Sequence, residues 1–349
     1  MKKSISVAVC VLCVAFIVCS MGGCAGKSSK IKVATKATTE GVAVQYAYDK
    51  GYFKDEGLDV EVMMFATGAP INEAMAAKEA DIAASGNATI FSLATGETTL
   101  LAELTSAAGG MGLFARPDSD ILTQKGLVEE LPDMYGSADT VKGKTFLAAL
   151  GTSTQLNVQK YANRFGLNKE DVEIIHMDFG PAYQAFVNGE GDVIATIPPY
   201  SFDLMRDGNV QIASYVDATG FDACDALFVR NEFLAGNRED VVKFVKAMMR
   251  ANSDLQDDKL RAEYSIDFFN NNGKSYDNEM MQQEIKVRSY LAKDQYTAGD
   301  YVFGKSFYEQ GDFFVENGNI EQDKVPNIKK ACDPAVLNEA LGISVEKPE

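Results

Sequence analysis

The chain has 349 residues, of which 46% are hydrophobic, so it is long enough to bury a sizeable core and to form two domains. Its formal net charge is −17 and it shows no cluster of lysine and arginine, which argues against nucleic acid and anionic lipid as main partners because phosphate neutralisation needs a basic footprint. His176 is the only histidine, which excludes metal sites built from several histidines.

The beginning of the chain is typical of an export signal. Two lysines precede an apolar run over residues 5–18, which is shorter than the ~18 or more residues that suit a membrane-spanning helix. Two glycines and Cys24 follow, and this layout resembles a bacterial lipoprotein signal. The resemblance implies a signal peptide at 1–23, a lipid on Cys24, a tether at 24–30 and a place outside the cytoplasm at the membrane. The alternative is an ordinary secretory signal that is cut elsewhere.

Only Cys224 and Cys332 remain beyond the signal. Two cysteines so far apart in sequence form neither a zinc pattern nor a disulfide framework. An oxidising compartment would allow a single bridge between them, and two separate buried thiols are an equally good interpretation.

The first part of the mature chain predicts an alternation of strands and helices. Strands are expected at 31–36, 58–65 and 81–84, a turn at 51–57, and helices at 41–50, 71–78 and 88–94. Strands that alternate with helices of this length favour a parallel sheet with helices on both faces.

A second unit of the same kind begins near residue 142, and a helical tail follows it. We expect strands at 143–149, 172–177, 192–197 and 210–216, with helices at 155–165, 182–188 and 200–206. After a further strand at 226–230, residues 238–345 are almost wholly helical in periodicity, with helices at 241–255, 261–270 and 280–291.

Two short segments are candidates for crossings between the units. Residues 112–116 and 226–230 share the pattern small-Leu-Phe-small-Arg, and irregular sequence that could absorb a hinge rotation precedes each. They predict one lobe made of 31–112 and 226–349 and a second lobe made of 113–225. Chance similarity between two short strands is the alternative.

One longer stretch carries a family resemblance. Residues 50–62 resemble the KGYFKDEGLDVEV signature of type II periplasmic binding proteins of the nitrate, sulfonate, taurine and thiamine-precursor group. Further matches to that family's patterns are found at 68–75, 80–87, 151–154, 165–172 and 185–192, the last followed by Pro199 and Tyr200. The similarity runs from about residue 31 to about residue 250.

The resemblance implies an α/β fold with two lobes, each a mainly parallel sheet flanked by helices, and a helical C-terminal tail. It also implies the solute-binding lipoprotein of an ABC importer, which captures a small ligand between its lobes and delivers it to the permease and its ATPase. We therefore expect a monomer that needs no cofactor.

The ligand site is expected in the loops that follow the strands. In open parallel sheets ligands collect beyond the carboxyl ends of the strands, and two facing sheets make a cleft. Several of these loops are rich in small polar residues and lead into helices, whose N-termini attract anions, although plain N-capping would explain any one of them. The residues predicted to bind ligand in this way are Thr38, Thr39, Gly68, Ser85, Asn87, Thr89, Thr152, Ser153 and Thr154, with Tyr200 as an aromatic wall.

Acidic residues at strand ends leave the charge of the ligand open. Asp178 and Asp225, with Asp217 and Asp222, fall at strand ends or near the second crossing. A carboxylate beside aromatic rings would suit an amine-bearing ligand, such as a thiamine pyrimidine, a flavin precursor or another heterocycle. The loops instead favour a sulfonate or nitrate, and an aminosulfonate such as taurine would satisfy both patterns.

Catalysis is not expected. The resemblance includes the pyrimidine synthases of thiamine biosynthesis, which carry a cysteine-rich iron motif and consume a histidine beside a pyridoxal-binding lysine. No cysteine cluster follows Cys24, and His176 lies inside a predicted strand. We therefore predict no catalytic residues and no metal site. A surface adhesin would require a large exposed apolar or aromatic patch, which the sequence does not show.

Overall fold

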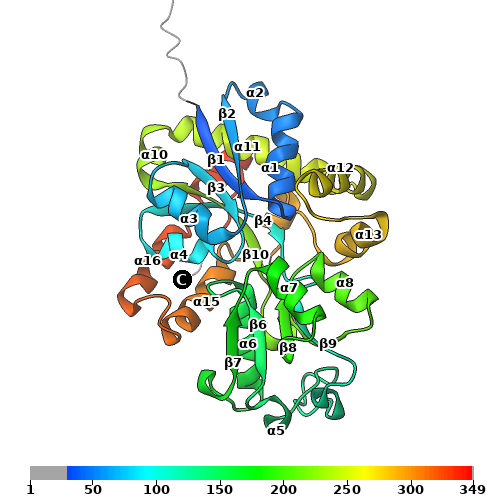
Figure 1. Ribbon diagram of the computed structural model, residues 1–349. Helices are drawn as coiled ribbons and strands as arrows, with labels where there is room; N and C mark the ends of the chain where they lie inside the picture. The colour runs from blue at the N-terminus through cyan, green and yellow to red at the C-terminus, as the bar shows by residue number, and fades with distance from the viewer. Residues whose placement is uncertain (1–29, 300, 348–349) are drawn as a thin grey trace, which may run out of the picture.

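The computed structural model describes residues 30–299 and 301–347. Within them the chain forms two five-stranded sheets flanked by helices, and these stand one above the other in Figure 1. We call the part built around β1–β4 and β10 lobe I, and the part built around β5–β9 lobe II. The predicted signal peptide and Cys24 lie outside the described residues, so the lipidation hypothesis is not addressed by the fold.

Four of the five strands in each sheet run in the same direction. The order is β2-β1-β3-β10-β4 in lobe I and β7-β6-β8-β5-β9 in lobe II. The strands are β1 (Ile31–Lys36), β2 (Val60–Phe65), β3 (Ile82–Ser85), β4 (Thr98–Ser106), β5 (Gly112–Ala115), β6 (Thr145–Ala148), β7 (Glu173–His176), β8 (Val193–Thr196), β9 (Val210–Ser214) and β10 (Cys224–Arg230). Only β10 and β5 are antiparallel to their neighbours, and each is the strand formed directly after the chain changes sheet. The two segments with the shared sequence pattern therefore occupy equivalent positions.

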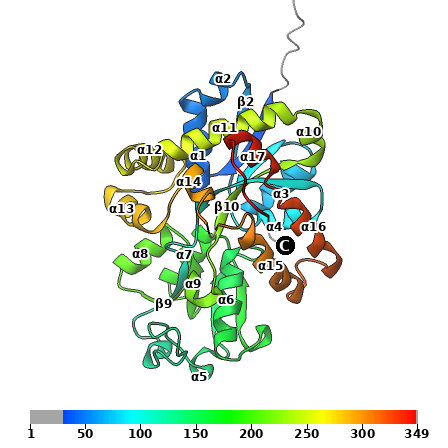
Figure 2. The ribbon, with the colours of Figure 1, turned by 180° about the vertical axis from the view of Figure 1, so that it is seen from behind.

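Helices cover both sheets, and the C-terminal tail packs on lobe I, with α11 against α1 and α17 (Figure 2). In the first part of lobe I they are α1 (Thr39–Asp49), α2 (Tyr52–Asp55), α3 (Gly68–Ala76) and α4 (Thr89–Ala94). Between β5 and β10 the helices are η1 (Asp120–Thr123), α5 (Ala138–Val141), α6 (Ser153–Arg164), η2 (Lys169–Asp171), α7 (Phe179–Val187), α8 (Tyr200–Arg206) and α9 (Tyr215–Thr219). The tail contains α10 (Asn231–Gly236), α11 (Arg238–Asp254), α12 (Asp258–Asn271), α13 (Asn278–Val287), α14 (Lys293–Tyr296), α15 (Lys305–Glu316), η3 (Gln322–Lys324), α16 (Val325–Ala331) and α17 (Ala335–Leu341). None of the helices in this part of the chain combines the length and apolar character needed to cross a membrane.

Two elements differ from the sequence-based expectations. Strand β4 was not predicted, because most of its side chains are buried and it shows no polar alternation that would mark a strand. The helix expected at 280–291 ends at Val287, because the following residues pair with β4: the Ser106 N–H donates to the Ser289 carbonyl at 2.9 Å, and the Leu291 N–H donates to the Leu104 carbonyl at 2.9 Å.

The chain passes between the sheets twice, over residues 107–111 and 215–223, and these two passages are bound to each other. The Ala107 N–H donates to the Ala223 carbonyl at 2.6 Å. Asp222 accepts from the Ser106 hydroxyl at 2.7 Å and from the Ala108 N–H at 3.1 Å. The passages end at residues 111 and 223, within two residues of the lobe boundaries that we propose after residues 112 and 225. The lobes are thus connected by one paired joint.

A buried carboxylate connects the sheet of lobe I to the tail. Glu103 on β4 is 2% exposed and accepts hydrogen bonds from the Tyr301 hydroxyl, the Gly304 N–H at 3.1 Å and the Ser306 hydroxyl at 3.3 Å. Burial raises the pKa of Glu103 despite these donors. Nearby, both Cys224 and Cys332 are free thiols, so the two-thiol interpretation holds.

Replacing Glu103 should therefore loosen the start of α15. Glu103→Ala leaves three buried donors without an acceptor, and at ~1–3 kcal/mol for each unpaired group the free energy of unfolding should fall by roughly 3 kcal/mol or more. Glu103→Gln keeps one acceptor oxygen and should lose clearly less. Urea unfolding of the three proteins measures this difference, and equal losses in the two variants would contradict the assigned role.

Candidate functional site

A cavity of about 580 Å³ lies between the two lobes. Its walls come from the ends of β1, β2 and β3 in lobe I and of β6, β7 and β8 in lobe II, and its back is formed by Ala107 and Met111 of the first passage. Strand ends from both sheets and the joint between them therefore meet at one place. This is the location that the strand-end rule indicates for a ligand site.

Four of the helices that begin at this cavity are preceded by a polar residue. The residues just before α1 and α3 are Thr38 and Thr67 in lobe I, and those before α6 and α7 are Thr152 and Asp178 in lobe II; all four line the cavity. Free backbone N–H groups and the helix dipole give each helix start a positive potential. Only Thr152 among the four uses its side chain to cap its own helix. The other three side chains make no capping bond, although the Thr38 hydroxyl is bound by Lys36.

Glycine at the start of α3 permits this convergence. A Cβ atom on Gly68 would lie 2.5 Å from the Cβ atom of Ala88 and 3.1 Å from the Ser85 hydroxyl. A side chain at this position would therefore push α3 away from the loop after β3.

The structure brings together seven of the twelve residues that the sequence indicated. Those that line the cavity are Thr38, Gly68, Ser85, Asn87, Thr152, Asp178 and Asp225. Six of them lie at or just after the ends of β1, β2, β3, β6 and β7, and Asp225 lies on β10. The Asn87 amide also donates to the Tyr215 hydroxyl at 3.2 Å and so connects the cavity to the second passage.

Thr39 and Thr89 do not line the cavity. Thr39 is 2% exposed: its hydroxyl donates to Glu284 at 2.8 Å and accepts from Arg288 at 2.8 Å. Thr89 is fully buried and its hydroxyl bonds to the Ser85 carbonyl at 3.3 Å. Both residues are in the first turn of their helices, where the side chain points back toward the protein interior rather than to the cleft.

The remaining three predicted residues are also turned away. The Ser153 hydroxyl contacts the Met111 sulfur at 3.6 Å, and the Thr154 hydroxyl bonds to the backbone at the end of β6. Tyr200 packs against Tyr183 with ring centroids 5.3 Å apart and does not form a wall of the cavity. These side chains therefore contact other parts of the protein and do not line the cavity.

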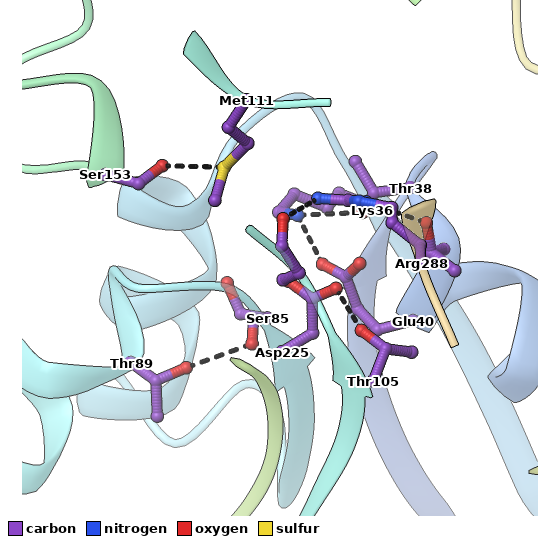
Figure 3. Close-up of polar contacts among 12 residues, drawn as sticks. Lys36, Thr38, Glu40, Ser85, Thr89, Thr105, Met111, Ser153, Asp225 and Arg288 are labelled. Atoms are coloured by element: carbon purple, nitrogen blue, oxygen red, sulfur yellow. Dashed lines mark hydrogen bonds and ion pairs between the residues drawn. The ribbon is translucent and has the colours of Figure 1, made fainter. Parts of the chain in front are cut away.

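The cavity is also lined by two cations that were not predicted from the sequence. Lys36 ends β1; its ammonium forms an ion pair with the buried Glu40 and donates to the Thr38 hydroxyl at 2.7 Å (Figure 3). Burial alone would raise the pKa of Glu40, but the charge of Lys36 and its hydrogen bonds hold it below the ordinary value. The sequence interpretation named small polar and acidic residues for this site and did not include Lys36.

Arg288 is the second cation, and it joins the cavity to the hinge. Its guanidinium donates to the Thr39 hydroxyl at 2.8 Å, the Ala107 carbonyl at 2.6 Å and the Gly109 carbonyl at 3.2 Å. Burial disfavours its charge, but the nearby carboxylates, Asp225 first among them, outweigh this and raise the pKa of Arg288. The side chain is thus fixed as a cation.

Asp225 faces these cations from β10. Its carboxylate accepts from the Thr105 hydroxyl at 2.6 Å and is 5% exposed. Burial and the charge of Glu40 raise the pKa of Asp225 to about 6, against the opposing effect of Arg288 and Lys36. The cavity floor therefore carries both signs of charge.

The rest of the lining is partly apolar. Phe91, Phe179 and Met111 contribute, in place of the tyrosine wall expected from sequence. His176 ends the edge strand β7 and its Nδ1 accepts from the Leu150 N–H at 3.1 Å, so the only histidine also lies at the cavity. Among residues 30–299 and 301–347 no group of acidic, histidine or cysteine side chains is placed to hold a metal ion.

A second cavity of about 580 Å³ lies on the outer face of lobe I, between α3, α4 and β10. Its cations are already paired at the surface, Lys78 with Glu232 and Arg230 with Asp81. Because only one lobe lines it, closure of the lobes could not enclose a ligand there. The cavity between the lobes is the stronger candidate.

Sequence position could have identified one of the missed cations. Lys36 is the last residue of β1 and so lies at one of the strand ends where the strand-end rule predicts ligand-binding residues. No local pattern marks Arg288, which enters the site from the extended run after α13.

Comparison with known proteins gives a consistent result. The protein-family model described as NMT1/THI5 like matches residues 38–259. A protein of Brachyspira hyodysenteriae named as an ABC transporter periplasmic binding protein is 29% identical over 317 residues, covering 90% of this chain and 91% of that protein. The 4-amino-5-hydroxymethyl-2-methylpyrimidine phosphate synthase THI13 of Saccharomyces cerevisiae is 24% identical, covering 88% and 91%.

The fold matches that of solved binding proteins. The alkanesulfonate-binding protein SsuA from Xanthomonas axonopodis pv. citri, bound to MOPS, superposes with a TM-score of 0.66 at 14% identity, covering 87% of this chain and 99% of that one. At this identity the likeness concerns the fold alone. Because the family model covers more than half of its length, the chain belongs to the NMT1/THI5-like family.

Proposed function

We propose that the protein is the extracytoplasmic solute-binding component of an ABC importer and that it captures a small organic anion of the sulfonate class between its lobes. The observation that carries this proposal is the convergence on one cavity of helix starts from both lobes, among them those of α1 and α3 from lobe I and of α6 and α7 from lobe II. Such an arrangement can hold an anion by backbone N–H groups from both sides.

The relatives support the same class of function. The Brachyspira relative is named as a periplasmic binding protein of an ABC transporter, and the structural neighbour is an alkanesulfonate-binding protein. Nitrate, a small anion, and taurine, a zwitterion that carries a sulfonate, are further ligands that we expect to fit.

The joint between the lobes provides a delivery mechanism. A ligand that contacts α1 and α3 on one lobe and α6 and α7 on the other binds the closed form better than the open form, and so shifts the population toward closure. The permease and its ATPase would then distinguish the two forms. We propose that a monomer performs this cycle without a cofactor.

An amine-bearing heterocycle is the second candidate ligand. Carboxylates of Glu73, Asp178 and Asp225 line the cavity together with Phe91 and Phe179, which would suit a cationic or aminopyrimidine ring. The yeast relative is a pyrimidine phosphate synthase, but we propose binding rather than catalysis here. Lys36 is ion-paired with Glu40, and an ammonium held in this way is a poor nucleophile.

Adding a methyl group at the start of α3 should weaken ligand binding. Gly68→Ala forces α3 away from Ala88, at a cost of ~1–3 kcal/mol for overpacking, so the affinity for an alkanesulfonate should fall about tenfold or more. Isothermal titration calorimetry with ethanesulfonate and 2-aminoethanesulfonate measures this.

Gly236→Ala on α10 is the matched control, because a Cβ there meets no neighbour within 4 Å. Its affinity should equal that of the parent. If Gly68→Ala also binds like the parent, the helix starts do not form the site.

The anchor hypothesis rests on Cys24 and is tested separately. Cys24→Ala should leave the protein uncut or free of the membrane, because the thiol that would take the diacylglyceryl group is missing. Mass spectrometry of the membrane fraction of the parent should find a lipid-modified terminus at Cys24. An unmodified mature terminus at another residue would rule out the anchor.

A further inference from the structure

We propose that the outer cavity of lobe I is a second chamber of the ligand site, which takes the uncharged tail of an elongated acid whose head group binds in the cleft. This inference rests on the function proposed above and narrows its ligand class to acids that carry a linear aliphatic chain of several carbons. One molecule would then occupy both the cavity between the lobes and the cavity on the outer face of lobe I.

The two cavities share part of their walls. Asn72 and Glu73 on α3 and Phe91 on α4 line both of them. Earlier residues of this region, such as Gly68 and Ala88, line only the cavity between the lobes, and later residues of the two helices line only the outer cavity. Since α3 and α4 pack side by side, the cavities are successive parts of one groove that follows both helices from their starts toward their ends.

Two hydrogen bonds and one aromatic ring form the boundary between the cavities. The Asn72 amide donates to the Ala88 carbonyl at 2.7 Å, and its oxygen accepts from the Ser92 hydroxyl at 2.8 Å, so the spacing of the helices is fixed here. Phe91 is half-buried, and its ring centroid lies 5.0 Å from that of Phe314. Rotation of this ring to another rotamer, rather than a movement of α3, would therefore open a passage along the groove.

The cavity volumes indicate a ligand larger than a two-carbon acid. Each cavity measures about 580 Å³, and sites of ~300–1,000 Å³ typically hold drug-sized molecules. Ethanesulfonate would leave most of the cleft empty. A longer chain would bury apolar surface against Phe91 and, beyond it, against Met75 and Ala76 of α3, which stabilises the complex in proportion to the area removed from water.

The far end of the outer cavity suits an uncharged group. Its lysine, Lys78, is paired with Glu232 at 2.5 Å. Its arginine, Arg230, is paired with Asp81 at 2.7 Å. The start of α3, which attracts an anion, lies at the opposite end of the groove, in the cleft. The groove therefore places an acid head at the start of α3 and a neutral tail toward the end of that helix.

A series of linear sulfonates tests the second chamber. Calorimetry on the full-length chain in detergent, with the heat of dilution into detergent alone subtracted, compares ethanesulfonate with butane-, hexane- and octanesulfonate. We expect the affinity to rise about two- to fourfold for each added methylene, the range for a methylene that is partly to fully buried. An affinity that stops rising at butanesulfonate would overturn the inference.

Filling the outer cavity distinguishes a tail in that cavity from a tail that stays in the cleft. Ala76 is exposed, ends α3 and lines only the outer cavity, so Ala76→Trp should occupy this space without reaching the cleft. The affinity of this variant for octanesulfonate should fall about tenfold or more. Its affinity for ethanesulfonate and its unfolding temperature should stay those of the parent.

Ala77→Trp is the matched control. Ala77 is the next residue along the chain, is also exposed and lines neither of the two cavities. This variant should bind both sulfonates like the parent. An equal loss of affinity for the two sulfonates in Ala76→Trp, or the same loss of octanesulfonate binding in both variants, would contradict a tail in the outer cavity.

The position of the tail can also be measured directly. In crystals of the complex with 8-bromooctanesulfonate, the anomalous signal of the bromine should lie between α3 and α4 in the outer cavity, beyond Phe91 as seen from the cleft. A bromine between the lobes would overturn the inference.

Failure of this inference and failure of the proposed function give different results. Binding of ethanesulfonate without a gain for the longer chains, or equal binding of octanesulfonate by the parent and Ala76→Trp, would overturn the second chamber and leave the sulfonate-binding function standing. Binding of none of the four sulfonates would contradict the proposed function and the inference together.

Discussion

The rest of the site depends on the hydrogen bonds that the Arg288 guanidinium donates. Its donors hold the start of α1, through Thr39, and the first passage between the lobes, through the carbonyls of Ala107 and Gly109. The same side chain lines the ligand cavity. One buried cation therefore connects the tail of the chain, the joint between the lobes and the binding site. A change in the surroundings of Arg288 on ligand binding would alter its hydrogen bonds to the joint.

Burying such a cation requires a balance of charge around it. A buried charge without a partner is strongly destabilising, and the floor of the cavity contains Lys36 with Glu40 and Arg288 near Asp225 and Glu284. Burial and the charge of Glu40 nevertheless raise the pKa of Asp225 to about 6.

The sequence was sufficient for the architecture because the alternation of elements is strong and the family signature is local. It also indicated where the cleft lies, since strand ends followed by small polar residues can be recognised in the sequence. It could not show which way a side chain in the first turn of a helix points. Four residues predicted to bind ligand therefore turn out to use their hydroxyls in hydrogen bonds within the protein: Thr39, Thr89, Ser153 and Thr154. It could not reveal Arg288 either, because that residue reaches the site only through the pairing of residues 288–291 with β4.

The central claim is that the ligand lies between the lobes, on the floor formed by Lys36, Asp225 and Arg288. A crystal structure of the protein grown with saturating 2-aminoethanesulfonate tests it most directly. We predict the compound in the cleft, with its sulfonate at the helix starts that line the cavity, those of α1 and α3 in lobe I or of α6 and α7 in lobe II. Density for the compound in the outer cavity between α3, α4 and β10, with an empty cleft, would contradict it.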